Sequence, residues 1–126
     1  MHNLPYMKIL PIAINNTDAR GFTCEFTNDR LGEQLLVFRK AGTVSGRHYH
    51  KGISATKNPE VFIVISGTCT FNWKHIDDTY IQSATVTGPT RIEVPPFIWH
   101  EVIPVTDCTC IELNSVAENV ADTFYL

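Results

Sequence analysis

The sequence predicts an all-β fold, either a sandwich of two antiparallel sheets or a small closed barrel. Its apolar runs are short and rich in Val, Ile, Thr and Phe, which are enriched in strands, and turn-forming residues separate them. Parallel strands would need crossover connections of about a dozen residues or more, usually helical, for which the chain has no room. With 126 residues, 44% of them hydrophobic, the chain is long enough to bury one core. We therefore expect one domain over residues 1–126.

The expected strands follow one another along most of the chain. Turn formers such as Asn15-Asn16, Asp77-Asp78 and Gly88-Pro89 separate neighbouring strands. In chain order the expected strands are Lys8–Ile14, Gly21–Phe26, Glu33–Arg39, Arg47–His50, Val61–Ser66, Thr68–Lys74, Tyr80–Val86, Arg91–Val94, Glu101–Val105 and Thr109–Leu113. One short helix is expected after them, at Val116–Ala121. Many short strands at this spacing are typical of sandwiches and barrels.

The composition argues against nucleic-acid and membrane partners. The formal net charge is -3, and the ten Lys and Arg residues are scattered, whereas binding a phosphate backbone needs clustered cations. No stretch approaches the roughly 20 apolar residues that span a bilayer. The first residues lack a basic leader and a small-residue cleavage site, so no signal peptide is expected. The four cysteines are expected to be buried free thiols, which suits a reducing cytoplasm.

Two stretches break the strand pattern, and each lies beside histidine. Residues 51–59 contain glycine, serine, asparagine and proline and are expected to form a loop. The pair Pro95-Pro96 cannot sit in a central strand. We expect these prolines to form a tight connection that presents His100 at the start of the next strand.

His48 and His50 stand one residue apart in an expected strand. Alternate side chains of a strand point the same way, so both imidazoles share one face while Tyr49 points to the other. Glu60 opens an apolar run that could lie antiparallel to this strand. Together with His100, three imidazoles and one carboxylate suit a divalent metal ion such as Zn²⁺, Mn²⁺, Fe²⁺, Ni²⁺ or Cu²⁺. The alternative is that His48 and His50 are catalytic proton-transfer groups without a metal.

The order and spacing of these residues resemble the first motif of the cupin superfamily. Gly46 precedes His48 and His50, and Glu60 is followed by six residues and then Gly67. The gap of nine residues between His50 and Glu60 is longer than is usual in the family.

The second cupin motif is matched by a later segment. Gly88 leads to Pro95 and then, in register, to His100, while Phe97 stands where the family has a glycine and Pro104 where an asparagine is common. The resemblance implies a double-stranded β-helix, the RmlC-like jelly-roll barrel, with a motif core at about 46–104. It also implies four metal ligands: His48, His50, Glu60 and His100.

A closer likeness concerns the cupin domains of bacterial capsule-sugar enzymes. The run Thr56-Lys57-Asn58, the pair Ser66-Gly67 and the closing residues 122–125 are similar to those domains. This resemblance implies an isomerase or epimerase that acts on a nucleotide-linked keto sugar by proton abstraction next to a carbonyl. Two alternatives stay open: an iron-dependent dioxygenase, and a sugar-binding or sensory module without catalysis.

A nucleotide-linked substrate would need cations and a pocket wall. The candidates for substrate binding are Arg47, Lys51, Lys57, Arg91, Trp99 and Phe97. Glu101 is expected to face away from His100. Glu112 shares a face with Cys108 and Cys110, but the sequence leaves open whether that face is the inner one.

Small cupins are commonly homodimers. The segment Met7–Ile14 has seven apolar or proline residues among its eight. Such a segment could add a strand to a partner's sheet.

Overall fold

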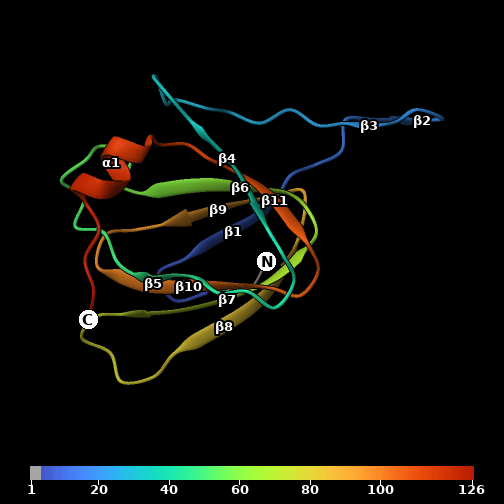
Figure 1. Cartoon of the computed structure of the whole chain (residues 1–126). Helices are drawn as coiled ribbons and strands as arrows, with labels where there is room; N and C mark the ends of the chain where they lie inside the picture. The colour runs from blue at the N-terminus through green and yellow to red at the C-terminus, as the bar shows by residue number, and fades with distance from the viewer. Residues whose placement is uncertain (1–3) are drawn as a thin grey trace.

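Two antiparallel sheets face each other and enclose the core (Figure 1). The computed structural model describes residues 4–126. The larger sheet has the strand order β1-β9-β6-β11-β4 and the smaller one β5-β10-β7-β8, while β2 and β3 form a separate hairpin. The elements are β1 (Lys8–Pro11), β2 (Asn16–Asp18), β3 (Gly21–Thr23), β4 (Leu35–Arg39), β5 (Ser45–His48), β6 (Glu60–Ser66), β7 (Thr68–His75), β8 (Gln82–Thr87), β9 (Thr90–Val94), β10 (Ile98–Pro104), β11 (Cys108–Glu112) and α1 (Val116–Ala121).

The core forms where the inner faces of the two sheets meet. Cys69, Phe71 and Trp73 of β7 are fully buried, as the period of two in a strand with one inner face requires. Ile92 of β9 faces them from the other sheet, and Phe62 stacks on Phe71 with ring centroids 5.0 Å apart. Burying each such large apolar side chain stabilises the fold by about 1.5–3 kcal/mol.

The expected strand pattern is largely confirmed, but several bounds differ. β1 ends at Pro11 rather than Ile14, β3 ends at Thr23 rather than Phe26, and β5 ends at His48, so His50 lies just beyond it. Residues 16–18 form β2, although Asn15-Asn16 was expected to be a turn; the turn instead follows Asp18, whose carboxylate accepts a hydrogen bond from the Arg20 backbone N–H. β10 begins at Ile98 rather than at Glu101, so His100 is its third residue. The helix begins and ends where the sequence predicted.

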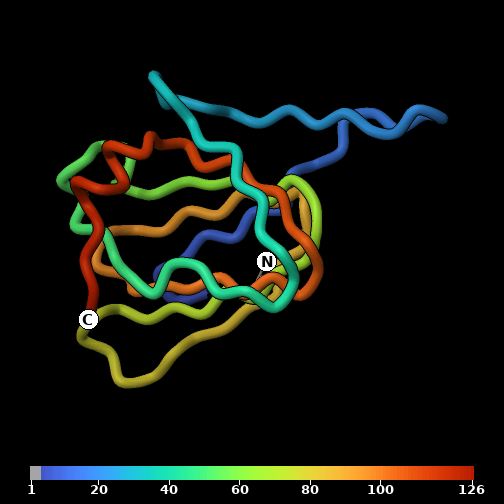
Figure 2. The backbone as a smooth tube through the Cα atoms, in the orientation of Figure 1, coloured from blue at the N-terminus to red at the C-terminus, as the bar shows by residue number. Residues whose placement is uncertain are grey.

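The β2–β3 hairpin extends away from the two packed sheets (Figures 1 and 2). We call residues 12–34 the arm. Most of its residues are exposed, including Phe22 and Phe26. Arg30 ties its end to the loop before β6 through a 2.6 Å hydrogen bond to the Pro59 carbonyl.

All four cysteines are free thiols, but only two, Cys69 and Cys108, are buried; Cys24 and Cys110 are half-buried. The chain's one helix within residues 4–126, α1, has six residues and is too short to cross a membrane.

Candidate metal centre and adjoining cavity

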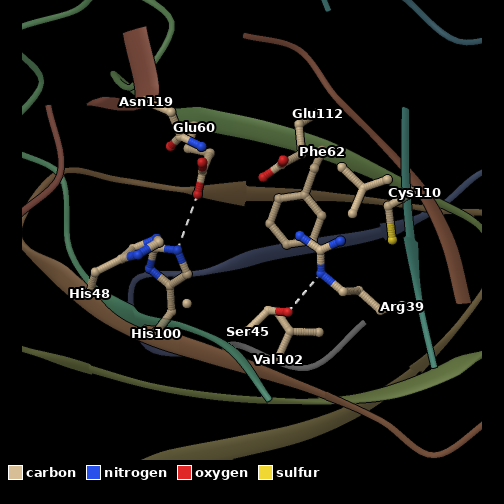
Figure 3. Close-up of a pocket in the computed structure, with 12 residues that line it drawn as sticks. Arg39, Ser45, His48, Glu60, Phe62, His100, Val102, Cys110, Glu112 and Asn119 are labelled. Atoms are coloured by element: carbon tan, nitrogen blue, oxygen red, sulfur yellow. Dashed lines mark hydrogen bonds and ion pairs between the residues drawn. The ribbon is translucent and has the colours of Figure 1, made fainter. Parts of the chain in front are cut away.

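A cavity of about 140 Å³ lies between the two sheets, beside α1 (Figure 3). β4, β6 and β11 form one wall and β5 and β10 the other. The lining residues are Val37, Arg39, Ser45, Gly46, His48, Glu60, Phe62, His100, Val102, Cys110, Glu112 and Asn119.

Three histidines gather at one end of this cavity. A ring nitrogen from each of His48, His50 and His100 lies within 4.8 Å of the others. His48 and His100 come close because they are paired directly across β5 and β10, and their ring centroids are 5.0 Å apart. Tyr49 points the other way, as expected from strand parity, and packs against Phe97 and Phe124.

Backbone carbonyls determine which nitrogen of two rings is free. His50 Nδ1 lies 2.5 Å from the carbonyl oxygen of Asp122, and His100 Nδ1 lies 2.9 Å from that of Ile98. A carbonyl oxygen only accepts hydrogen bonds, so each Nδ1 must carry the proton and donate it. In the neutral rings, both Nε2 atoms therefore present lone pairs to the site, as histidines that ligate metals usually do.

His48 completes the group from the half-buried end of β5. Burial lowers the pKa of His48 to about 3, and the neighbouring His100 and His50 add to this effect. The ring is therefore neutral near pH 7 and its free nitrogen is available as a ligand.

Glu60 reaches the histidines from the opposite sheet. Its strand, β6, pairs with β9 and β11, so the expected pairing with the His48 strand is wrong. Because the two sheets face each other, the Glu60 carboxylate instead crosses the space between them. Its Oε1 lies 3.1 Å from His100 Nε2 and 3.3 Å from His50 Nε2.

The carboxyl of Glu60 is ionised despite its burial. Burial alone would raise its pKa, but hydrogen bonds from His100 and His50 in their protonated form and the charge of Lys57 outweigh this cost and hold the pKa well below its ordinary range. The site therefore contains a buried negative charge that needs compensation.

Lys57 supplies part of this compensation. Its side chain is fully buried, and Nζ donates hydrogen bonds to Glu60 Oε2 at 2.5 Å and to Asn119 Oδ1 at 2.8 Å. The sequence suggested a cation at the pocket mouth, and that placement is wrong: the loop turns Lys57 inward because Glu60 is the partner that its buried ammonium requires.

The long loop before Glu60 is held by α1. The Asp122 carboxylate accepts hydrogen bonds from the backbone N–H groups of Lys51 and Ser54, and Glu118 accepts one from the Thr56 hydroxyl. Glu118 also completes the capping box with Ser115 at the start of the helix. These contacts explain how the expanded loop still delivers Glu60 to the histidines.

The backbone around the histidines is tightly constrained at Gly46 and Phe97. Gly46 has φ 88°, and a Cβ there would stand 2.9 Å from the His100 carbonyl oxygen. Only glycine therefore lets β5 approach β10 this closely. Phe97 stands where the motif has glycine and keeps the left-handed conformation, with φ 65°; its N–H donates to the His50 carbonyl at 2.7 Å.

The residues present fit a divalent metal ion. His50 Nε2 is buried and has no hydrogen-bond partner among residues 4–126. The anionic Glu60 Oε1 lies 3.1 Å from the Nε2 lone pair of His100 and 3.3 Å from that of His50. Such acceptor atoms repel one another unless a cation or a proton lies between them. Imidazole and carboxylate ligands suit Zn²⁺, Fe²⁺, Mn²⁺ and Ni²⁺ alike.

Two charged residues that sequence reasoning did not assign also line the cavity. Glu112 of β11 faces inward with Cys110, which decides the orientation that the sequence left open. Burial raises the pKa of its carboxyl, and the nearby charge of Glu60 adds to the effect. Arg39 lies on the neighbouring strand β4, and its Nε donates a hydrogen bond to Ser45 Oγ at 2.9 Å (Figure 3).

The cavity lining includes none of four predicted substrate-binding residues, Arg47, Lys51, Arg91 and Trp99. Arg47 pairs with Glu101, Arg91 pairs with Glu93, and the Lys51 ammonium lies over the Phe124 ring.

The orientation of Trp99 follows from the alternation of side chains along β10. Trp99 alternates with Ile98 and His100, whose side chains point inward, so it lies on the outer face of β10 together with Glu101. These four residues thus lie outside the lining of this cavity, and their contacts with a substrate stay a prediction.

Solved structures of sugar-modifying enzymes share this fold. QdtA, a sugar 3,4-ketoisomerase from Thermoanaerobacterium thermosaccharolyticum solved in complex with TDP, has a TM-score of 0.74 and 16% identity over 98% of this chain and 90% of its own. The dTDP-4-dehydrorhamnose 3,5-epimerase from Sulfolobus tokodaii has a TM-score of 0.67 and 17% identity over 89% of this chain and 72% of its own. A search of curated proteins gave no match.

The capsular polysaccharide assembling protein CapF from Staphylococcus aureus is also similar. It has 28% identity and a TM-score of 0.60 over 92% of this chain. The chain spans only about a third of CapF, 34% of its length.

The fold defines a protein of the cupin jelly-roll class, and the three histidines supply a possible metal site. Residues 16–122 match the polysaccharide biosynthesis C-terminal domain. The chain therefore belongs to the polysaccharide biosynthesis C-terminal domain family.

Proposed function

We propose that this protein is a metal-dependent isomerase or epimerase that acts on a nucleotide-linked keto sugar. The observation that carries the proposal is the convergence of His48, His50, His100 and Glu60 at one end of a cavity that also contains a non-ligand carboxylate, Glu112. The fold shared with a sugar 3,4-ketoisomerase and a 3,5-epimerase supports the choice of reaction class.

The proposed reaction needs several roles, and different residues of the site would fill them. Moving a proton next to a ketone requires a base for the C–H proton and stabilisation of the oxygen that becomes negative. A divalent ion held by His48, His50, His100 and Glu60 would supply positive charge for that oxygen. Lys57 holds the Glu60 carboxylate in place, and the Asp122 and Ile98 carbonyls orient the histidine rings.

Metal analysis of the purified protein tests the ligand set. We expect about one equivalent of a divalent ion in wild type, its loss in His48→Ala, and loss or strong depletion in Glu60→Ala, because each variant removes a donor from a small cluster. His75→Ala is the matched control, since His75 lies outside the cluster and should leave the metal content unchanged. Metal retained in both site variants would contradict the assignment; none in wild type would favour proton transfer by His48 and His50.

The reaction class is tested by isotope exchange. Incubation with TDP-4-keto-6-deoxyglucose, or with its UDP counterpart, in D₂O should introduce deuterium next to the carbonyl. A protein that contains iron and consumes oxygen would instead favour the dioxygenase alternative. Ligand binding without exchange would favour a sugar-binding module.

A further inference from the structure

Glu112 is a carboxylate in the cavity wall without an assigned partner. It belongs to β11, where it pairs in register with Phe62 of β6, and its side chain points into the cavity (Figure 3). No hydrogen bond or ion pair joins its carboxylate to another residue within 4–126 under the usual distance limits. Partial burial in this wall reduces the hydration of the carboxylate, and no hydrogen-bond donor of the described residues replaces the lost water. Such an arrangement costs stability and is typical of functional sites.

Its position separates it from the histidine cluster. Neither Glu60 nor Glu112 belongs to the group of three histidines whose nitrogen atoms could hold a metal ion together, but only Glu60 contacts those rings. Glu60 is already the carboxylate that contacts His50 and His100. Glu112 is therefore free to act on a molecule in the cavity rather than on the metal.

We propose that Glu112 is the catalytic base that removes the proton next to the substrate carbonyl and returns a proton to the resulting enolate. This inference rests on the proposed function and names the group that the reaction needs beyond the metal ligands.

The step balances without any further reactant. The C–H bond breaks, its electron pair becomes the enolate double bond, and the proton forms a neutral carboxylic acid on Glu112. Return of the proton to the former carbonyl carbon regenerates the carboxylate, and passage of the hydroxyl proton between the two enediol oxygens completes the isomer of the substrate. Exchange of the acid proton with solvent before its return places deuterium on carbon in D₂O. The burial that raises the Glu112 pKa also makes the ionised group a stronger base.

The surroundings of Glu112 fit a polar, anionic or hydroxylated ligand. Arg39 lies on the neighbouring strand β4, with its Nε bonded to Ser45 and its Nη1 to the Phe38 carbonyl, so the N–H groups of Nη2 can reach a ligand oxygen. Phe62 and Val102 provide apolar walls for the face of a sugar ring.

The test compares Glu112→Gln, Glu112→Ala and wild type loaded with the same metal. With TDP-4-keto-6-deoxyglucose as the probe, Glu112→Gln should lower the rate of deuterium incorporation by about 10²–10⁴-fold, the usual contribution of a general base. Its metal content should stay near the wild-type value, and its melting temperature should not fall below that of wild type. Glu93→Gln is the control, because Glu93 is a strand carboxylate of the same sheet that pairs with Arg91.

Glu112→Ala provides a second readout. Removing the side chain leaves space in the cavity wall, and formate added to this variant should restore part of the exchange if the missing group is a base. Formate should not accelerate wild type.

The outcomes separate this inference from the proposed function. No exchange by wild type with either nucleotide sugar overturns the proposed function, and the role of Glu112 with it. Exchange by wild type and by Glu112→Gln within tenfold of one another overturns the role of Glu112 alone. Loss of metal from Glu112→Gln also overturns it, because Glu112 would then be a ligand.

Discussion

The pairing of Lys57 with Glu60 is the most consequential contact at the residue scale. A fully buried ammonium and a nearly fully buried carboxylate meet at 2.5 Å, and Asn119 satisfies a second N–H of the ammonium. Buried pairs of this kind contribute little net stability compared with apolar residues, but loss of one partner is costly. Lys57 therefore matters for keeping Glu60 ionised and oriented toward the histidines.

Lys57→Met should destabilise the protein by about 3–5 kcal/mol, because Glu60 would remain buried without its cation. Urea denaturation followed by tryptophan fluorescence measures the change. Lys40→Met is the control, since Lys40 is exposed, and it should stay within about 0.5 kcal/mol of wild type. A Lys57→Met protein as stable as the control would show that Glu60 does not depend on this ion pair.

At the scale of elements, α1 and the long loop act as one support for the site. The loop is polar and lacks regular structure, so its order depends on the contacts that Asp122, Glu118 and Asn119 make with it. The same helix end supplies the carbonyl that orients His50. A change in the helix should therefore reach the histidines through the loop.

Glu118 should make this support sensitive to acid. Hydrogen bonds from Thr56 and Ser115 lower its pKa from 4.5 to about 2. Because the folded pKa lies below the ordinary value, its contribution to stability is complete above about pH 4.5 and is lost as the pH falls toward 2.

Glu118→Gln isolates this contribution. The variant keeps the size of the side chain, and its unfolding free energy should lie below that of wild type by less than about 1 kcal/mol near neutral pH, because the site is solvent-accessible. Urea unfolding measured from pH 6 to pH 2 should show the two proteins converge at the acid end. A difference that stays constant over this range would exclude the titration of Glu118 as its cause.

At the scale of the whole molecule, the arm carries apolar side chains that do not pack into the chain's own core. The expected partner-sheet segment Met7–Ile14 is used within the chain: Met7 is buried in the core and β1 pairs with β9. Exposed apolar side chains lie instead on the arm, at Phe22 and Phe26, and on the edge strand β4, at Leu36 and Phe38. The homodimer thus stays a prediction, with these surfaces as its proposed contacts.

The oligomeric state is measured by size-exclusion chromatography with light scattering. We expect a mass near twice that of the 14.2 kDa chain. Replacing Phe22 and Phe26 together by Ser should shift the protein toward the monomer. Association would then no longer bury the apolar surface of these two rings, which is the expected driving force. A wild-type monomer at every concentration tested would contradict the prediction.

The sequence by itself determined the class of the fold and most of the histidine cluster. Period-two alternation placed His48 and His50 on one face and Tyr49 on the other, and the Pro95-Pro96 turn indicated that His100 is presented to the site. These features depend on local geometry, in which strand parity and the restriction of proline act within a few residues.

Only the tertiary structure decided which charges face the cavity. Glu60 reaches the histidines from the opposite sheet, Lys57 turns inward, and Glu112 points toward the cavity. Arg47 and Arg91 instead pair with half-buried carboxylates outside the cavity. Parity along one strand states which side chains share a face, but it does not state which face is the inner one. That choice depends on which strands pair and which sheets stack, and these contacts join residues far apart in the chain.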